Sequence, residues 1–200
     1  WAEYFNKQGI AYFVLKYRMP KGDRNIPLSD AYQAIRTVRD SAEVWHINKK
    51  DVGIMGFSAG GHLASSVSTH AEEAVRPNFS ILFYPVISMD ERITHKGSCV
   101  NFLGEERKTN AKLVEEWSND KAVRPQVTPR VILLMSSDDK VVPPVTNGVA
   151  YYTAMNKAGN ECTLHIYPSG GHGWGFRNTV QGFRYHVQML DDLTTWLQHF

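Results

Sequence analysis

Short apolar runs alternate along the chain with segments in which apolar residues recur at helical spacing. The runs are Ile10–Leu15, Asp51–Met55, Phe79–Ile87, Val131–Met135 and Cys162–Tyr167. Short runs of this kind are typical of strands that are buried on both faces of a parallel sheet. Helical spacing predicts helices that begin at Ser29 or Asp30, at Ala59, at Pro144 and near Phe183. This alternation predicts an α/β fold, with a mostly parallel sheet and helices on both faces.

Two stretches, residues 1–8 and residues 88–128, do not fit the alternation of strands and helices. Residues Trp1–Gln8 have the pattern of a helix end, with Gly9 as its stop signal. We therefore expect residues 1–200 to be a single domain that is truncated at its N-terminus. Residues 88–128 are polar and irregular, with a short helical piece at residues 111–117. We interpret this stretch as an insertion over the strand ends.

Composition narrows the class of protein. The chain has 200 residues, of which 42% are hydrophobic, enough for one domain with a full core. Its 22 basic and 20 acidic residues give a net charge of +2, which argues against nucleic-acid and membrane-surface partners. No apolar run approaches the ~18 residues of a membrane span. Cys99 and Cys162 do not form a disulfide framework, and these residues contain no signal-peptide pattern. The sequence does not determine the compartment, which is either cytoplasmic or secreted or periplasmic. It does not determine the oligomeric state either.

One motif carries candidate chemistry. The sequence Gly56-Phe57-Ser58-Ala59-Gly60 has the form G-x-S-x-G and stands between a predicted strand and a predicted helix. That context is typical of a nucleophile elbow, in which a sharp turn lifts the serine hydroxyl above the sheet edge. A chance match in a glycine-rich turn is the alternative. The motif predicts Ser58 as a nucleophile.

A serine nucleophile needs a base, and the base needs a carboxylate to orient it. His172 stands among glycines just past the last predicted strand, where functional groups of a parallel sheet gather. The other histidines stand at less suitable positions, inside elements, at helix ends or in other loops: His46, His62, His70, His95, His165, His186 and His199. His62 lies one helical turn after Ser58, so we expect it to pack or to bond locally. His172 is the predicted base.

Two aspartates compete for the role of the acid. Asp138 and Asp139 both follow the Val131–Met135 strand, and either completes the chain order serine, aspartate, histidine. Both could instead be turn formers before Pro143.

Three segments resemble a known family. They are Gly56–His62, Ser137–Pro143 and Gly170–Gly175, and together they resemble α/β-hydrolase esterases of the bacterial carbohydrate-esterase branch. This branch includes acetyl-xylan-esterase-like enzymes and is related to the catalytic domain of prolyl oligopeptidases. The resemblance covers the whole chain. It implies that the acid is Asp139, in the pattern Asp-x-Val-Val-Pro, with Asp138 as runner-up.

The sequence departs from this family before its first strand. The family has a further strand and a glycine-rich loop whose N–H groups donate to the oxyanion. Neither is found in this sequence, and the strand would lie between Ile10–Leu15 and the elbow strand. The backbone N–H of Ala59 is the one oxyanion donor that the motif predicts. Without the second donor we expect slow turnover and a weakened sheet.

The resemblance implies a serine esterase that hydrolyses short acyl esters, above all acetyl esters of carbohydrates such as xylan and its oligosaccharides. It implies no metal and no organic cofactor. Trp174, beside the histidine, could stack on a sugar, wall the acyl pocket or only pack the loop. The alternative functions are a prolyl-oligopeptidase-type peptidase and an inactive hydrolase-fold fragment.

Overall fold

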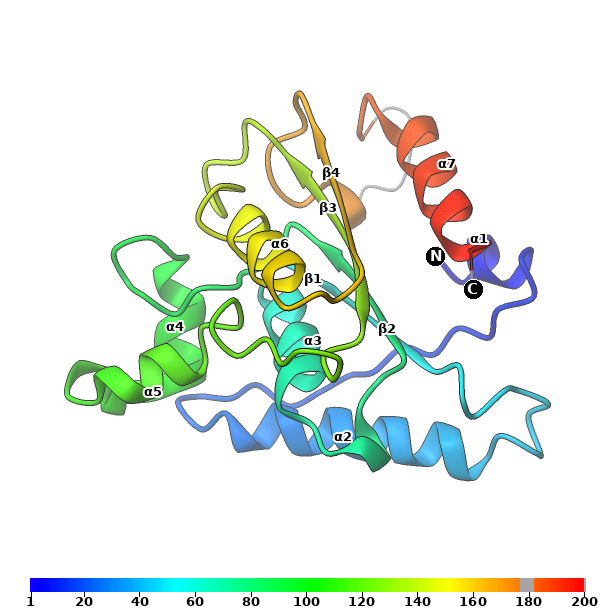
Figure 1. Ribbon diagram of the computed structural model, residues 1–200, viewed down its shortest axis with the longest axis horizontal. Coiled ribbons are helices and arrows are strands. Elements are labelled where there is room, and N and C mark those ends of the chain that lie inside the picture. Colours follow the sequence, from blue (N-terminus) through cyan, green and yellow to red (C-terminus); the bar gives the residue numbers. More distant parts are fainter. Residues whose placement is uncertain (177–181, 200) are drawn as a thin grey trace.

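A four-stranded sheet forms the centre of the protein (Figure 1). The computed structural model describes residues 1–176 and 182–199. The strands are β1 (Gly53–Phe57), β2 (Phe79–Phe83), β3 (Arg130–Ser136) and β4 (Cys162–Tyr167). All neighbours pair in parallel, in the order β1-β2-β3-β4. The carboxyl ends of all four strands therefore meet at one edge of the sheet, as the sequence predicts.

Seven α-helices are found in the described residues. They are α1 (Ala2–Asn6), α2 (Asn25–Asp40), α3 (Ala59–His70), α4 (Lys96–Leu103), α5 (Ala111–Glu116), α6 (Gly148–Lys157) and α7 (His186–Leu197). Short 3₁₀ turns lie at Glu73–Val75, Gly104–Lys108 and Trp174–Phe176. Within residues 1–176 and 182–199, the helices are too short or too polar to cross a membrane.

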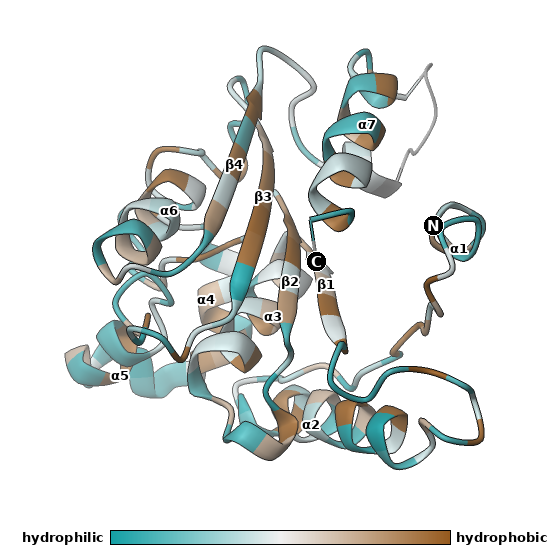
Figure 2. Ribbon diagram, turned by 45° about the vertical axis from the view of Figure 1, so that its right-hand side comes forward, coloured by the Kyte–Doolittle hydropathy of each residue, from teal (hydrophilic) through white to brown (hydrophobic). Residues whose placement is uncertain are grey.

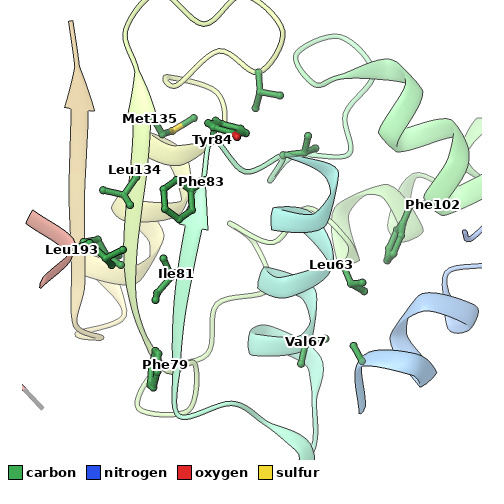
Figure 3. Close-up of a cluster of buried hydrophobic side chains, with 14 of the residues drawn as sticks. Leu63, Val67, Phe79, Ile81, Phe83, Tyr84, Phe102, Leu134, Met135 and Leu193 are labelled. Atoms are coloured by element: carbon green, nitrogen blue, oxygen red, sulfur yellow. The ribbon is translucent and has the colours of Figure 1, made fainter. Parts of the chain in front are cut away.

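Helices cover both faces of the sheet, which confirms the predicted α/β class (Figure 2). Because side chains alternate along a strand, neighbouring residues face opposite helices. Leu82 and Leu133 belong to a buried cluster with Met155 of α6. Ile81 and Leu134, one position away, belong to a larger cluster that includes α7 (Figure 3).

The predicted strand at Ile10–Leu15 is wrong. These residues run as an irregular extended segment from α1 toward α2 (Figure 1). Val14 is 82% exposed, and Phe13 and Leu15 are also exposed. A strand requires a hydrogen-bonded neighbour, and among the described residues β1 pairs only with β2. Among the described residues the run therefore has no strand to pair with, and only Ile10 and Tyr12 pack against the core.

Two other predicted boundaries also move. Helix α2 starts at Asn25 rather than at Ser29 or Asp30, and Asp30 instead binds Arg18, 2.7 Å from its guanidinium. Strand β2 ends at Phe83, because Tyr84 has a positive φ of 35°, which interrupts an extended strand.

The stretch at residues 88–128 is more helical than predicted, since α4 and α5 both lie within it. Its helices lie beside α3 (Figure 1). Phe102 contacts His62, and Trp117 stacks on His70 with ring centres 4.2 Å apart. Asn119 donates from its side-chain amide to the His62 carbonyl and to Ser65. These buried contacts hold the stretch against the helix that follows the elbow.

Candidate active site

The elbow predicted around Ser58 is found between β1 and α3. Ser58 has φ 53° and ψ −119°, a region that costs a non-glycine residue roughly 1–3 kcal/mol. Its N–H donates to the Phe83 carbonyl at 3.0 Å, and its carbonyl accepts from Val86 at 3.1 Å. A Cβ at Gly56 would lie 2.3 Å from the Gly60 carbonyl, so the first glycine of the motif is needed for close approach. The hydrogen bonds to Phe83 and Val86 therefore hold the backbone of Ser58 in its strained conformation.

The imidazole of His172 joins Ser58 to Asp139. The loop after β4 carries His172, and its Nε2 lies 2.8 Å from Ser58 Oγ. Its Nδ1 lies 2.7 Å from Asp139 Oδ2. In the tautomer that suits both contacts, Nδ1–H donates to the carboxylate and Nε2 accepts from the serine hydroxyl. The three predicted side chains thus form one hydrogen-bonded chain, although they lie 33 and 114 residues apart.

The structure distinguishes the two aspartates. Asp139 is only 3% exposed, and its Oδ1 accepts from the N–H groups of Val141 and Val142 at 2.9 Å each. Its other oxygen is thereby left to His172. Asp138 is exposed and accepts from Gly171 N–H at 2.8 Å, a bond that lowers the pKa of its carboxyl. Only Asp139 contacts the imidazole.

Ala59, the predicted oxyanion donor, opens α3. The first N–H groups of a helix have no intrahelical acceptor, and they lie at the positive end of its dipole. An anion that forms on a group attached to Ser58 would meet this end of the helix. The position of Ala59 at the start of α3 is compatible with that role, and Ala59 N–H as the oxyanion donor stays a prediction.

Trp174 does not face the site, and its predicted substrate-binding role is wrong. Its side chain is 0% exposed and stacks on Phe183 with ring centres 4.0 Å apart. Phe83 and Tyr84 pack against its edges. An indole with both faces inside the core cannot stack on a sugar, so the packing alternative holds.

His62 behaves as the sequence predicts for a residue that packs locally. It is 2% exposed, and its Nε2–H donates to the Trp117 carbonyl at 2.9 Å. Burial lowers its pKa from 6.5 to about 4. It is not part of the chain formed with Ser58.

Acid should therefore destabilise the protein through His62. Below pH 6.5 the unfolded chain binds a proton at this residue, whereas the folded chain does so only near pH 4. Stability should consequently fall as the pH drops through this window, by about 2 kcal/mol between pH 7 and pH 5. Urea unfolding at both pH values should show this loss in the parent protein and a loss roughly 2 kcal/mol smaller in His62→Gln. Equal losses in the two proteins would contradict the prediction, and His199→Gln, at an exposed histidine, is the matched control.

An apolar cavity of about 230 Å³ lies beside Ala59. It is walled mainly by side chains from the segment before α2, from α3 and from α4: Tyr17, Met19, Pro20, Leu63 and Phe102. Sequence patterns could not find it, since its walls come from segments far apart in the chain. Within the described part of the chain, no three His, Cys, Asp or Glu side chains converge as a metal site.

A model of the alpha/beta hydrolase fold matches residues 4–176. The chain belongs to the α/β-hydrolase family. This result confirms the resemblance seen in the sequence motifs. Along this α/β-hydrolase the candidate serine, aspartate and histidine follow in the chain order of the family, and they lie after β1, β3 and β4.

Two curated relatives of this α/β-hydrolase are larger proteins. An acetylxylan esterase from Xylanibacter ruminicola is 59% identical over 197 residues, which are 98% of this chain and 40% of the relative. Endo-1,4-beta-xylanase B from Butyrivibrio fibrisolvens is 32% identical over 186 residues, 86% of this chain and 28% of the relative. The chain thus spans less than half the length of either relative.

A solved structure shares the fold closely. The acetyl ester-xyloside bifunctional hydrolase from Caldicellulosiruptor lactoaceticus superposes with a TM-score of 0.85 at 33% identity. The match covers 98% of this chain and 75% of that one.

Proposed function

We propose that this α/β-hydrolase is a serine esterase that removes short acyl groups, above all acetyl groups, from carbohydrates such as xylan and its oligosaccharides. The observation that carries the proposal is the hydrogen-bonded chain from Ser58 through His172 to Asp139. A serine hydroxyl that donates to an oriented imidazole can be deprotonated as it attacks an ester carbonyl. The choice of acetylated xylan rests on the names of the relatives above.

The geometry supports the following reaction for the proposed esterase. As Ser58 Oγ bonds to the ester carbonyl carbon, its proton passes to His172 Nε2, and the carbonyl oxygen becomes an oxyanion near Ala59 N–H. When the tetrahedral intermediate collapses, the C–O bond to the alcohol breaks and the imidazolium returns the proton to that alcohol. Asp139 holds the ring and stabilises its positive charge throughout. Water then attacks the acyl-serine by the same steps and releases the acid.

A panel of substrates tests this proposal against the alternatives. The purified protein is assayed on p-nitrophenyl acetate, on acetylated xylo-oligosaccharides and on a prolyl p-nitroanilide, and is treated with a fluorophosphonate probe. We expect hydrolysis of both acetyl esters, labelling of Ser58 and no cleavage of the anilide. Cleavage of the anilide would favour a peptidase. Failure to hydrolyse any ester, together with an unlabelled Ser58, would indicate an inactive scaffold.

A longer acyl chain should lower the catalytic efficiency of ester hydrolysis. We expect kcat/KM to be about tenfold or more higher for p-nitrophenyl acetate than for the octanoate. Each added methylene gains ~0.8 kcal/mol only where a pocket buries it. A steady rise of kcat/KM from acetate to octanoate would contradict the prediction. The cavity beside Ala59 would then be the first place to look, and Met19→Trp, which narrows it, should reduce turnover of octanoate but not of acetate.

A further inference from the structure

The loop that carries His172, here called the histidine loop, comprises residues 168–176. Three of its glycines have positive φ values: Gly170 at 146°, Gly171 at 60° and Gly173 at 83°. Glycine-rich backbone adopts many conformations at similar cost, so the loop's own sequence does not fix the imidazole. A productive site needs its catalytic groups held to within roughly 0.5 Å. The restraint on His172 must therefore come from outside the loop.

Two side chains outside the loop accept backbone N–H groups on either side of His172. Asp138 Oδ1 accepts from Gly171, the residue immediately before it, at 2.8 Å. The Tyr84 hydroxyl accepts from Gly175, three residues after it, at 2.9 Å. Asp138 follows β3 and Tyr84 follows β2, so the loop is tied to the ends of two strands.

Tyr84 is held in an unusual conformation at this position. Its φ of 35° is in the left-handed region, which an aromatic residue rarely adopts. Its ring is fully buried and lies 4.6 Å, centre to centre, from the imidazole of His172. A Cβ at Gly175 would lie 2.8 Å from the Tyr84 hydroxyl and 2.6 Å from the Phe57 ring. In this strained conformation the Tyr84 hydroxyl lies so close to Gly175 that a larger residue at position 175 would collide with it.

Gly175 is held from its other side as well. Trp1 Nε1–H donates to the Gly175 carbonyl at 3.0 Å. Both polar groups of this one peptide residue are therefore satisfied by aromatic side chains from distant parts of the chain. The end of the histidine loop is thus tied by two hydrogen bonds at Gly175, and its middle by the bond from Gly171 to Asp138.

We propose that Asp138 and Tyr84 are positioning residues that hold the backbone at Gly171 and Gly175 and so keep the His172 imidazole between Ser58 and Asp139. The role of this positioning in turnover rests on the esterase function proposed above. The two adjacent aspartates then have separate tasks: Asp139 orients the ring, and Asp138 anchors the backbone that carries it. Charge strengthens the anchoring bond, because a carboxylate accepts more strongly than a neutral oxygen.

Single-group deletions test the proposal in the full chain. Asp138→Ala removes one acceptor, and Tyr84→Phe removes the other while keeping the ring. Each should lower kcat on p-nitrophenyl acetate about tenfold, with KM changed less than about twofold, and the double variant should lose about a hundredfold. Asp138→Asn keeps an oxygen that can accept from Gly171 and should recover most of the loss seen in Asp138→Ala. Tyr12→Phe, at a tyrosine outside the site, is the matched control for loss of a hydroxyl.

A second readout does not depend on hydrolysis. The proton on His172 Nδ1, which is donated to Asp139, should give a low-field NMR resonance that broadens in Asp138→Ala and in Tyr84→Phe as exchange with water accelerates. This result would support the positioning role even if the proposed esterase activity failed. Equal losses of kcat in Asp138→Ala and Asp138→Asn would overturn the anchoring role of Asp138. An unchanged resonance and kcat in Tyr84→Phe would overturn that of Tyr84.

Discussion

Replacement of Ser58 with alanine should lower turnover of p-nitrophenyl acetate by about 10⁶-fold. The hydroxyl is the only group of this side chain that can form the acyl-enzyme. Without it, the side chain of residue 58 offers His172 Nε2 no proton to accept. Fluorophosphonate labelling should disappear at the same time. The backbone strain at Ser58 is kept in the variant, because alanine and serine share the same restrictions at φ 53°.

The fold of the Ser58→Ala variant should be intact. Ser58 N–H and its carbonyl, rather than its hydroxyl, bind Phe83 and Val86, so the elbow keeps its contacts. We expect the melting temperature of Ser58→Ala to be close to that of the parent protein. Ser29→Ala, at a surface serine, is the control and should keep full activity. Labelling that persists in Ser58→Ala would show that another residue is the nucleophile.

Replacement of Asp139 with asparagine should lower kcat by about 10⁴-fold. One carboxylate oxygen accepts from Val141 and Val142, so the amide oxygen must stay on that side to satisfy them. The amide NH₂ group then faces His172 Nδ1, at the place where the carboxylate oxygen accepted a hydrogen bond from Nδ1–H. The imidazole is driven to carry its proton on Nε2, which can no longer accept from Ser58.

The neighbouring aspartate provides the matched comparison. Asp138 binds a backbone N–H and does not touch the imidazole, so Asp138→Asn should cost less than about tenfold in kcat. Steady-state kinetics of both variants on p-nitrophenyl acetate, with melting temperatures as a check on folding, measure the difference. The reverse order of losses would mean that Asp138 is the acid and that the motif register is off by one.

Most of the sheet could be predicted because its strands are short, mostly apolar runs that are flanked by turn residues. Cys162–Tyr167 matches β4 at both ends, and Val131–Met135 lies within β3. The candidate nucleophile, base and acid could be predicted too, because the fold brings the carboxyl ends of β1, β3 and β4 to one edge. Position after the strand leaves Asp138 and Asp139 as equal candidates for the acid, and the motif resemblance is the sequence argument that favours Asp139.

The failures share a cause. The run Ile10–Leu15 is at least as apolar as β4, yet it forms no strand and its last three residues are exposed, because pairing and burial depend on what lies beside a segment and not on its own composition. Trp174 is two residues from His172, but the short 3₁₀ turn that begins at Trp174 directs its indole into the core while the imidazole faces Ser58. The side chains of Trp174 and His172 therefore point in different directions, although the two residues are close in sequence.

By itself, the sequence determined the alternation of strands and helices, the strand–serine–helix elbow and the chain order of the candidate triad, because each depends on local periodicity or on a contiguous motif. Only the tertiary structure decided which aspartate reaches the imidazole, that Trp174 packs inward, and that Tyr84 and Asp138 bind the histidine loop. The contacts of the two aspartates and of Tyr84 join segments 33 and 91 residues apart. Such contacts are set by the packing of the whole domain and leave no periodic signal in the chain.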